Sequence, residues 1–228
     1  MQAKIYGHCL KRRDNAPIVK DVYGGIIDIL MKEKNIEYAI RFLRESLQNI
    51  VDGKCGMDKL VITKALRSGY KKPQQIAHKV LADRMGKRDS GNKPGTGDRI
   101  PYIYIENKDR KALQGERIET PEFIIKNKGK VKINYSFYIT NQIMKPLLQL
   151  FALVLEQMKD FRKKKGHTLR LWIKELEDLK KEYPDPEKYK DKEEALRNKE
   201  VKALLFDAYI RKTSNANKGA REITDYFQ

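Results

Sequence analysis

Cysteine and histidine are scarce in this sequence. Its 228 residues include two cysteines and three histidines, and no Cys-x-x-Cys pair occurs. This scarcity excludes a disulfide framework and a structural zinc site with the usual ligand spacing. Cys9 and Cys55 therefore predict an intracellular, reducing environment.

Long apolar runs are also missing. No stretch approaches the ~18 consecutive apolar residues that a membrane-spanning helix requires. The N-terminal stretch "MQAKIYGHCLKRRD" lacks the apolar segment of a secretory signal. The sequence therefore predicts no membrane partner.

The short motifs of common catalytic sites are absent. The glycine-rich stretch "SGNKPGTG" at 90–97 has neither the G-x-x-x-x-G-K-[ST] order of a phosphate-binding loop nor the G-x-G-x-x-G dinucleotide fingerprint. G-x-S-x-G and H-E-x-x-H do not occur either. Most carboxylates alternate with lysine on predicted helix faces, which is typical of solvated ion pairs. We therefore predict no catalytic residue, metal ligand or cofactor in this chain.

Positive charge is abundant and unevenly distributed. The chain has 49 basic and 31 acidic residues, a net charge of +18. The segment 59–111 holds fourteen basic and five acidic residues, and hence half of the surplus. Clustered Lys and Arg neutralise phosphates and release counterions, so this segment predicts a polyanionic partner. The alternative is a lysine-rich surface that only contacts solvent.

Hydrophobic periodicity predicts a mainly α fold with a small β element, in the α+β class. Helices are expected at 12–34, 35–53, 72–89 and 135–161, and two more within 162–212. Strands are expected at 59–66 and 99–107, and a turn-rich connector at 112–136. Asn35 is expected to cap the second helix, Pro146 to kink or restart the helix at 135–161, and Gly24-Gly25 to permit close packing.

Three basic stretches suit contacts with a nucleic-acid backbone, namely "KRRD" at 11–14, "ITKALRSGYKK" at 62–72 and "ADRMGKRD" at 82–89. They mix Arg and Lys with Ser, Thr and Tyr, which favours phosphate contacts over base readout. On the predicted helix at 72–89 the side chains of Arg84, Lys87 and Arg88 are expected to point away from the apolar face.

Four ordered blocks resemble the thumb segment of family B DNA polymerases. They are "KRRDNAPIV", "KLVITKAL", "VLADRMGKRDSGNKPGTGDRIPYIYI" and "FYITNQIMKPLLQLFALVLE". The resemblance covers about residues 7 to 158, and its detail is most similar to the polymerases of large DNA viruses and of the eukaryotic delta type.

The resemblance implies a DNA-gripping role in a replicative polymerase, in the nucleus or at a viral replication site. It divides the chain into a palm–thumb junction at 1–16, a thumb-like domain at 17–161, a charged helical extension at 162–212 and a flexible tail at 213–228. The residues that it implies as contacts to primer–template duplex are Arg12, Arg13, Lys64, Arg67, Tyr70, Lys71, Lys72, Arg84, Lys87, Arg88 and Arg99.

The chain departs from the family pattern in its missing catalytic parts. It contains no Asp-Thr-Asp, so the catalytic aspartates and the magnesium ions of the family's palm are expected elsewhere in the polymerase. The chain is therefore expected to be the C-terminal third or less of such an enzyme and to need the remainder for synthesis. Whether it is a fragment, a split subunit or a complete product stays open.

The last residues resemble a clamp-binding tail. Ile223, Tyr226 and Phe227 have the spacing of the aliphatic and aromatic anchors, while Ala220 stands where glutamine is usual. A sliding clamp is thus a candidate partner, and terminal packing is the alternative. For the whole chain, the alternative function is a stand-alone basic DNA-binding or scaffolding protein. The thumb interpretation requires the cations of the central third to converge on one concave surface.

Overall fold

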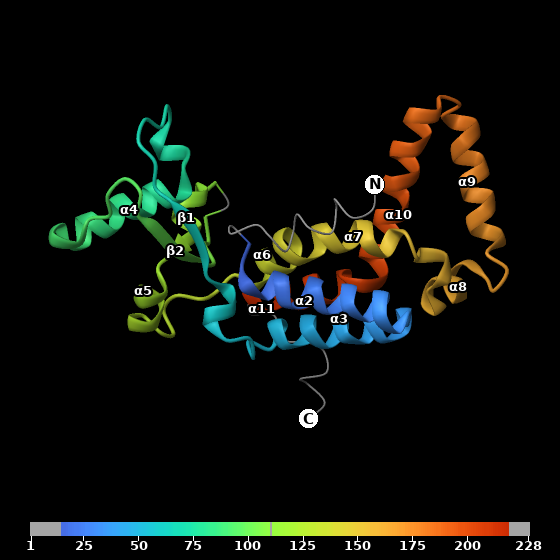
Figure 1. Ribbon diagram of the computed structural model, residues 1–228, viewed down its shortest axis with the longest axis horizontal. Helices are drawn as coiled ribbons and strands as arrows, with labels where there is room; N and C mark the ends of the chain where they lie inside the picture. Colours follow the sequence, from blue (N-terminus) through green and yellow to red (C-terminus); the bar gives the residue numbers. More distant parts are fainter. Residues whose placement is uncertain (1–14, 110, 219–228) are drawn as a thin grey trace. The chain divides into compact units, whose positions relative to one another are not determined.

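The computed structural model describes residues 15–109 and 111–218, with the backbone alone at 215–218. The chain divides into two compact units (Figure 1). Unit 1 comprises Met1–Asp21 and Asp52–Tyr138, and unit 2 comprises Val22–Val51 and Ile139–Gln228. Helices dominate both units, and the described strands all lie in unit 1. The predicted fold class, mainly α with a small β element, is confirmed.

Two neighbouring helices begin the described chain. α2 (Pro17–Asp28) continues into a π-helical turn at Ile29–Glu33, and α3 (Ile36–Val51) follows. The side chain of Asn35 accepts a hydrogen bond from the Tyr38 N–H at 2.9 Å, so the predicted cap is confirmed. A Cβ on Gly25 would lie 2.7 Å from the ring of Phe42, so glycine permits the close approach of α2 and α3.

Unit 1 is built on a three-stranded antiparallel sheet in the order β1-β2-β3. β1 (Ile62–Ala65) and β2 (Arg99–Tyr104) confirm the two predicted strands, and β3 (Ile118–Glu119) lies in the predicted connector. α4 (Ala77–Arg88) packs against the sheet (Figure 1).

The predicted connector also contains a short helix that sequence analysis missed, α5 (Pro121–Lys126). The hydroxyl of Thr120 accepts a hydrogen bond from the Phe123 N–H at 3.2 Å, and Pro121 occupies the first turn. Thr followed by Pro is a helix-start signal, but six residues are too few to show a helical period.

Aromatic side chains fill the other side of the sheet. α6 (Tyr135–Phe137) places Phe137 against Tyr104, with ring centres 3.4 Å apart. The buried hydroxyl of Tyr138 accepts a hydrogen bond from the Tyr104 N–H at 3.0 Å and donates one to the Leu60 carbonyl at 2.8 Å. Burial raises the pKa of Tyr138. Tyr102 is 4% exposed and Tyr104 stacks on Phe137, so both tyrosines of β2 pack in the core of unit 1.

Unit 2 is helical. The helix expected at 135–161 is interrupted by a π-helical segment at Tyr138–Ile143, after which α7 (Met144–Ala152) begins. Pro146 lies in the first turn of α7, which confirms the expected restart. α8 (Lys159–Lys165) and α9 (Arg170–Glu182) follow.

Two further helices close unit 2, α10 (Pro186–Leu205) and α11 (Asp207–Lys218). α10 packs on α7, and α11 packs on α3. The stretch at 213–218 has linker composition but continues α11, and within the helix the Thr213 hydroxyl donates to the Ile210 carbonyl at 2.9 Å. None of the helices in the described ranges is both long and apolar enough to span a bilayer.

Candidate nucleic-acid interface

One group of predicted contact residues surrounds His78 on α4. The Arg67 N–H donates to the Tyr70 hydroxyl at 2.8 Å, and this hydroxyl lies 3.1 Å from His78 Nε2. The Tyr70 hydroxyl thus joins the backbone of Arg67 to the ring of His78. Burial lowers the pKa of His78, and nearby Lys64 and Arg67 lower it further. Tyr70 is therefore a fixed element of this surface.

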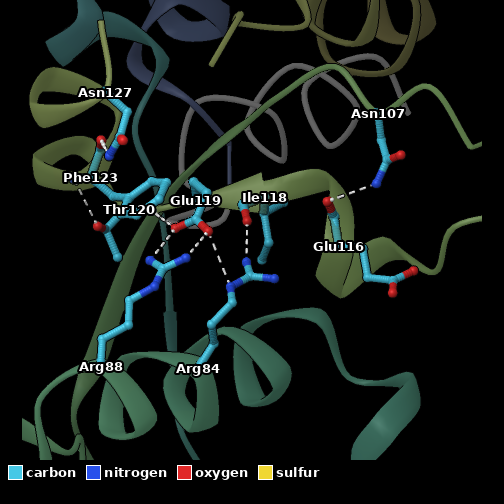
Figure 2. A network of polar contacts seen from close by, with 9 residues as sticks. All are labelled: Arg84, Arg88, Asn107, Glu116, Ile118, Glu119, Thr120, Phe123 and Asn127. Carbon is cyan, nitrogen blue, oxygen red and sulfur yellow. Dashed lines mark hydrogen bonds and ion pairs between the residues drawn. The ribbon is translucent and has the colours of Figure 1, made fainter. Parts of the chain in front are cut away.

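A second group is held by a buried carboxylate (Figure 2). Glu119 of β3 is 4% exposed and accepts a hydrogen bond from each terminal guanidinium nitrogen of Arg88, at 2.7 and 3.1 Å. Arg84 donates to the Ile118 carbonyl at 2.6 Å. Its Nε also lies 3.1 Å from Glu119, although this N–H is not aligned for a hydrogen bond. Both arginines project from α4 towards the sheet, so the expectation that they point away from the interior is wrong.

The same carboxylate links α4 to α5. Glu119 accepts a hydrogen bond from the Thr120 N–H at 3.2 Å, and Thr120 caps α5. The guanidinium of Arg88 lies 3.7 Å from the ring centre of Phe123 in α5. Burial lowers the pKa of Arg84, and the nearby Glu119 opposes this effect. Sequence analysis missed Glu119, because no local pattern connects a residue of a short strand with a helix some thirty residues earlier.

The lysines of this interface remain in solvent. Lys64 on β1, Lys71 and Lys72 after it, and Lys87 on α4 are all exposed. Within residues 15–109 and 111–218, no ion pair or side-chain hydrogen bond engages their ammonium groups. Their charges are therefore available to an external anion.

Arg99 points away from Lys64. In the β1–β2 register Ala65 pairs with Arg99, and Lys64 pairs with Ile100. Side chains alternate between the two faces of a sheet, so Lys64 and Arg99 lie on opposite faces. Arg99 donates to the Thr63 hydroxyl at 2.9 Å and to its carbonyl at 3.2 Å. The structure therefore does not bring these two cations together on one surface.

Several predicted residues lie outside the described part of the chain. These are Arg12 and Arg13 at the start, and Ile223, Tyr226 and Phe227 at the end. A magnesium site does not fit the residues that are described, because no three His, Cys, Asp or Glu side chains among them form a metal-binding group.

Comparisons with known proteins support the resemblance to family B DNA polymerases. Residues 2–154 match the family model for DNA polymerase family B. The DNA polymerase of Pyramimonas orientalis virus is 50% identical over 98% of this chain and 18% of its own length. That of Acanthamoeba polyphaga mimivirus is 48% identical, over 70% of this chain and 9% of its own.

A cellular relative extends the comparison. The DNA polymerase delta catalytic subunit of Caenorhabditis elegans is 35% identical over 63% of this chain and 13% of its own length. The predicted similarity to large DNA viruses and to the delta type is thus confirmed. The chain spans less than a fifth of each of these three relatives.

Proposed function

This chain belongs to DNA polymerase family B, and we propose that it forms the thumb of a replicative enzyme, which grips primer–template duplex. One observation carries the proposal. From Leu60 to Ala82 the sequence contains no acidic residue. In the structure Lys64, Lys71 and Lys72 of this segment are exposed to solvent. A segment with solvent-exposed cations and no acidic residue of its own attracts the phosphates of a nucleic acid.

The proposed grip is electrostatic and independent of base sequence. Lys64, Arg67, Lys71, Lys72 and Lys87 contact backbone phosphates, and the counterions that they displace contribute to the affinity. Tyr70 borders this surface with its hydroxyl held by Arg67 and His78. The remainder of the polymerase supplies the catalytic aspartates and the magnesium ions.

Arg84 and Arg88 have a different part in this proposal. Their guanidinium groups are engaged by Glu119, so they hold α4 in place rather than reach for DNA. By holding α4, Arg84 and Arg88 position the exposed Lys87 of the same helix, which makes the phosphate contact.

Removing three of the exposed lysines should weaken DNA binding strongly. We expect the variant Lys64→Gln/Lys71→Gln/Lys72→Gln to make the negative slope of log K against log salt shallower by about three units. Each lost phosphate contact removes about one unit from the slope. The loss should be similar for duplexes of different sequence. Fluorescence anisotropy of a labelled primer–template duplex, titrated with the 228-residue chain at several salt concentrations, measures both quantities.

The matched control removes the same charge elsewhere in unit 1. Lys126, Lys128 and Lys130 are exposed as well, and the variant with glutamine at these positions should retain the wild-type slope. Equal loss in the two variants would show that only net charge matters, and the proposed site would be abandoned.

We further propose that Ile223, Tyr226 and Phe227 tether the enzyme to a sliding clamp, which would raise its effective concentration on DNA. Triple alanine substitution at these positions should abolish capture of a purified clamp by the chain and leave duplex affinity unchanged. Capture at the wild-type level would refute the tether.

A further inference from the structure

The helical extension beyond the family match has its own concentration of positive charge. The family model ends at residue 154, so the match assigns no role to α8. The segment 159–174 contains seven basic residues and one acidic residue, whereas α10 contains six basic and five acidic residues. The extension is therefore not uniformly basic, and its charge is concentrated around α8.

The one acidic side chain of α8 is neutralised within unit 2. Asp160 pairs with Arg44 of α3 at 2.8 Å. Next to it, the backbone N–H of Lys159 donates to Glu37 of α3 at 3.0 Å. These two contacts fix the first turn of α8 against α3, and they remove the carboxylate that could otherwise screen the surrounding cations.

The last two lysines of α8 form ion pairs with carboxylates of α9 and α10. Lys164 pairs with Glu200 of α10 at 2.8 Å, and Lys165 pairs with the same carboxylate at 3.1 Å. Lys165 also pairs with Glu175 of α9. Both lysines flank Phe161, which is fully buried. The carboxylates nearest to α8 on α9 and α10 are thus already occupied.

The remaining cations of α8 lie on its outer side. With 100° of rotation per residue, Lys159 and Lys163 fall opposite the buried Phe161, and Arg162 lies beside them. All three are exposed, and within the described residues no ion pair or side-chain hydrogen bond engages them. They span about 6 Å of helix axis, close to the rise of about 7 Å over two phosphate steps of one DNA strand.

We propose that Lys159, Arg162 and Lys163 form a second phosphate-binding surface, the α8 cation surface, whose occupant is the backbone of duplex DNA. Charge complementarity identifies the partner: three adjacent cations outnumber the nearby carboxylates, of which Asp160 is ion-paired and Glu37 accepts the Lys159 N–H, and they match a linear polyanion. Because α8 is anchored by α3 and α10, binding orders the three side chains but not the backbone that carries them. It is separate from the lysines of unit 1 and does not depend on them.

The test removes the three charges from the 228-residue chain. We expect Lys159→Gln/Arg162→Gln/Lys163→Gln to lower the salt slope of duplex binding by about two to three units and to weaken binding roughly tenfold at low salt. The control variant Lys188→Gln/Lys190→Gln/Lys199→Gln removes equal charge from exposed positions of α10 and should stay within about twofold of wild type. Comparison with the Lys64→Gln/Lys71→Gln/Lys72→Gln variant separates the two surfaces, since each should lose its own part of the slope.

A measurement on the wild-type chain removes any dependence on variant folding. Duplex should protect Lys159 and Lys163, but not Lys188 and Lys190, from chemical acetylation detected by mass spectrometry. The α8 cation surface is refuted if the α8 variant binds like the α10 control, or if acetylation of Lys159 and Lys163 is unchanged by duplex. Binding to phosphatidylserine vesicles without binding to duplex would also overturn it.

Discussion

Replacing Glu119 with alanine should lower the free energy of unfolding of unit 1 by about 3 kcal/mol. Breaking a buried ion pair by removing one partner costs about 3–5 kcal/mol, because the other charge is left uncompensated. The lower end applies here, since the side chains of Arg84 and Arg88 retain 27% and 36% of their exposure. The loss also removes the carboxylate that joins α4 to β3 and α5.

Two companion variants separate charge from packing in this prediction. Glu119→Gln keeps the size of the side chain and should cost less than alanine. Replacing all three partners with apolar residues, as Glu119→Leu/Arg84→Met/Arg88→Met, should cost less than Glu119→Ala alone, because no buried charge is then left unpaired.

Hydrogen exchange followed by mass spectrometry suits this chain, because two compact units need not unfold in a single transition. Peptides from 77–126 should lose protection in Glu119→Ala, while peptides from α10 should not. Unchanged protection of α4 would show that the Arg84–Glu119–Arg88 network does not stabilise unit 1.

Structural features with a local physical cause could be predicted from the sequence, and features that depend on distant residues could not. The apolar positions of α3, its cap at Asn35 and the restart at Pro146 depend on residues within one or two turns, so the sequence reveals them. α5 was not predicted, because six residues are too few to show a helical period of hydrophobic residues. The strand pairing of β3 depends on a partner many residues away, which no local pattern specifies.

The same distinction applies to the candidate interface. Exposed lysines such as Lys64 and Lys71 were predicted from composition, because a strong local excess of charge must reach solvent. The orientations of Arg84 and Arg88 could not be predicted in this way. Both lie on a helix with basic neighbours, and only the sheet register brings Glu119 beneath them. Charge count therefore identifies a basic segment but does not say which cations are available.

A similar long-range arrangement holds unit 2 around Trp172, and replacing this residue with alanine should cost about 3–5 kcal/mol. Its ring is 1% exposed and meets Phe161 edge to face, with centres 5.1 Å apart. The indole N–H donates to Glu156 at 3.0 Å, and Arg197 pairs with the same carboxylate at 2.7 Å. Truncation leaves a cavity between α8 and α9 and removes the indole donor to Glu156.

Trp172→Phe and Leu171→Ala calibrate this effect. Phenylalanine retains most of the buried ring, and Arg197 still satisfies Glu156, so we expect a loss of about 1 kcal/mol, near the net value of one hydrogen bond. Leu171 is 62% exposed on the same helix, and its truncation should change stability by less than about 0.5 kcal/mol. Hydrogen exchange of peptides from α8 and α9 measures all three effects, because it reports on unit 2 separately from unit 1.

The Trp172 variant also probes the α8 cation surface, because Phe161 fixes the orientation of α8 from its buried side. Loosening that contact should reduce hydrogen-exchange protection of α8 and α9, and should lower the salt slope of duplex binding with every cation still present. In unit 1, protection of β1 and β2 should be unchanged. A Trp172→Ala chain as stable as the Leu171→Ala control would contradict the packing argument, and with it the claim that α8 presents its cations from a rigid support.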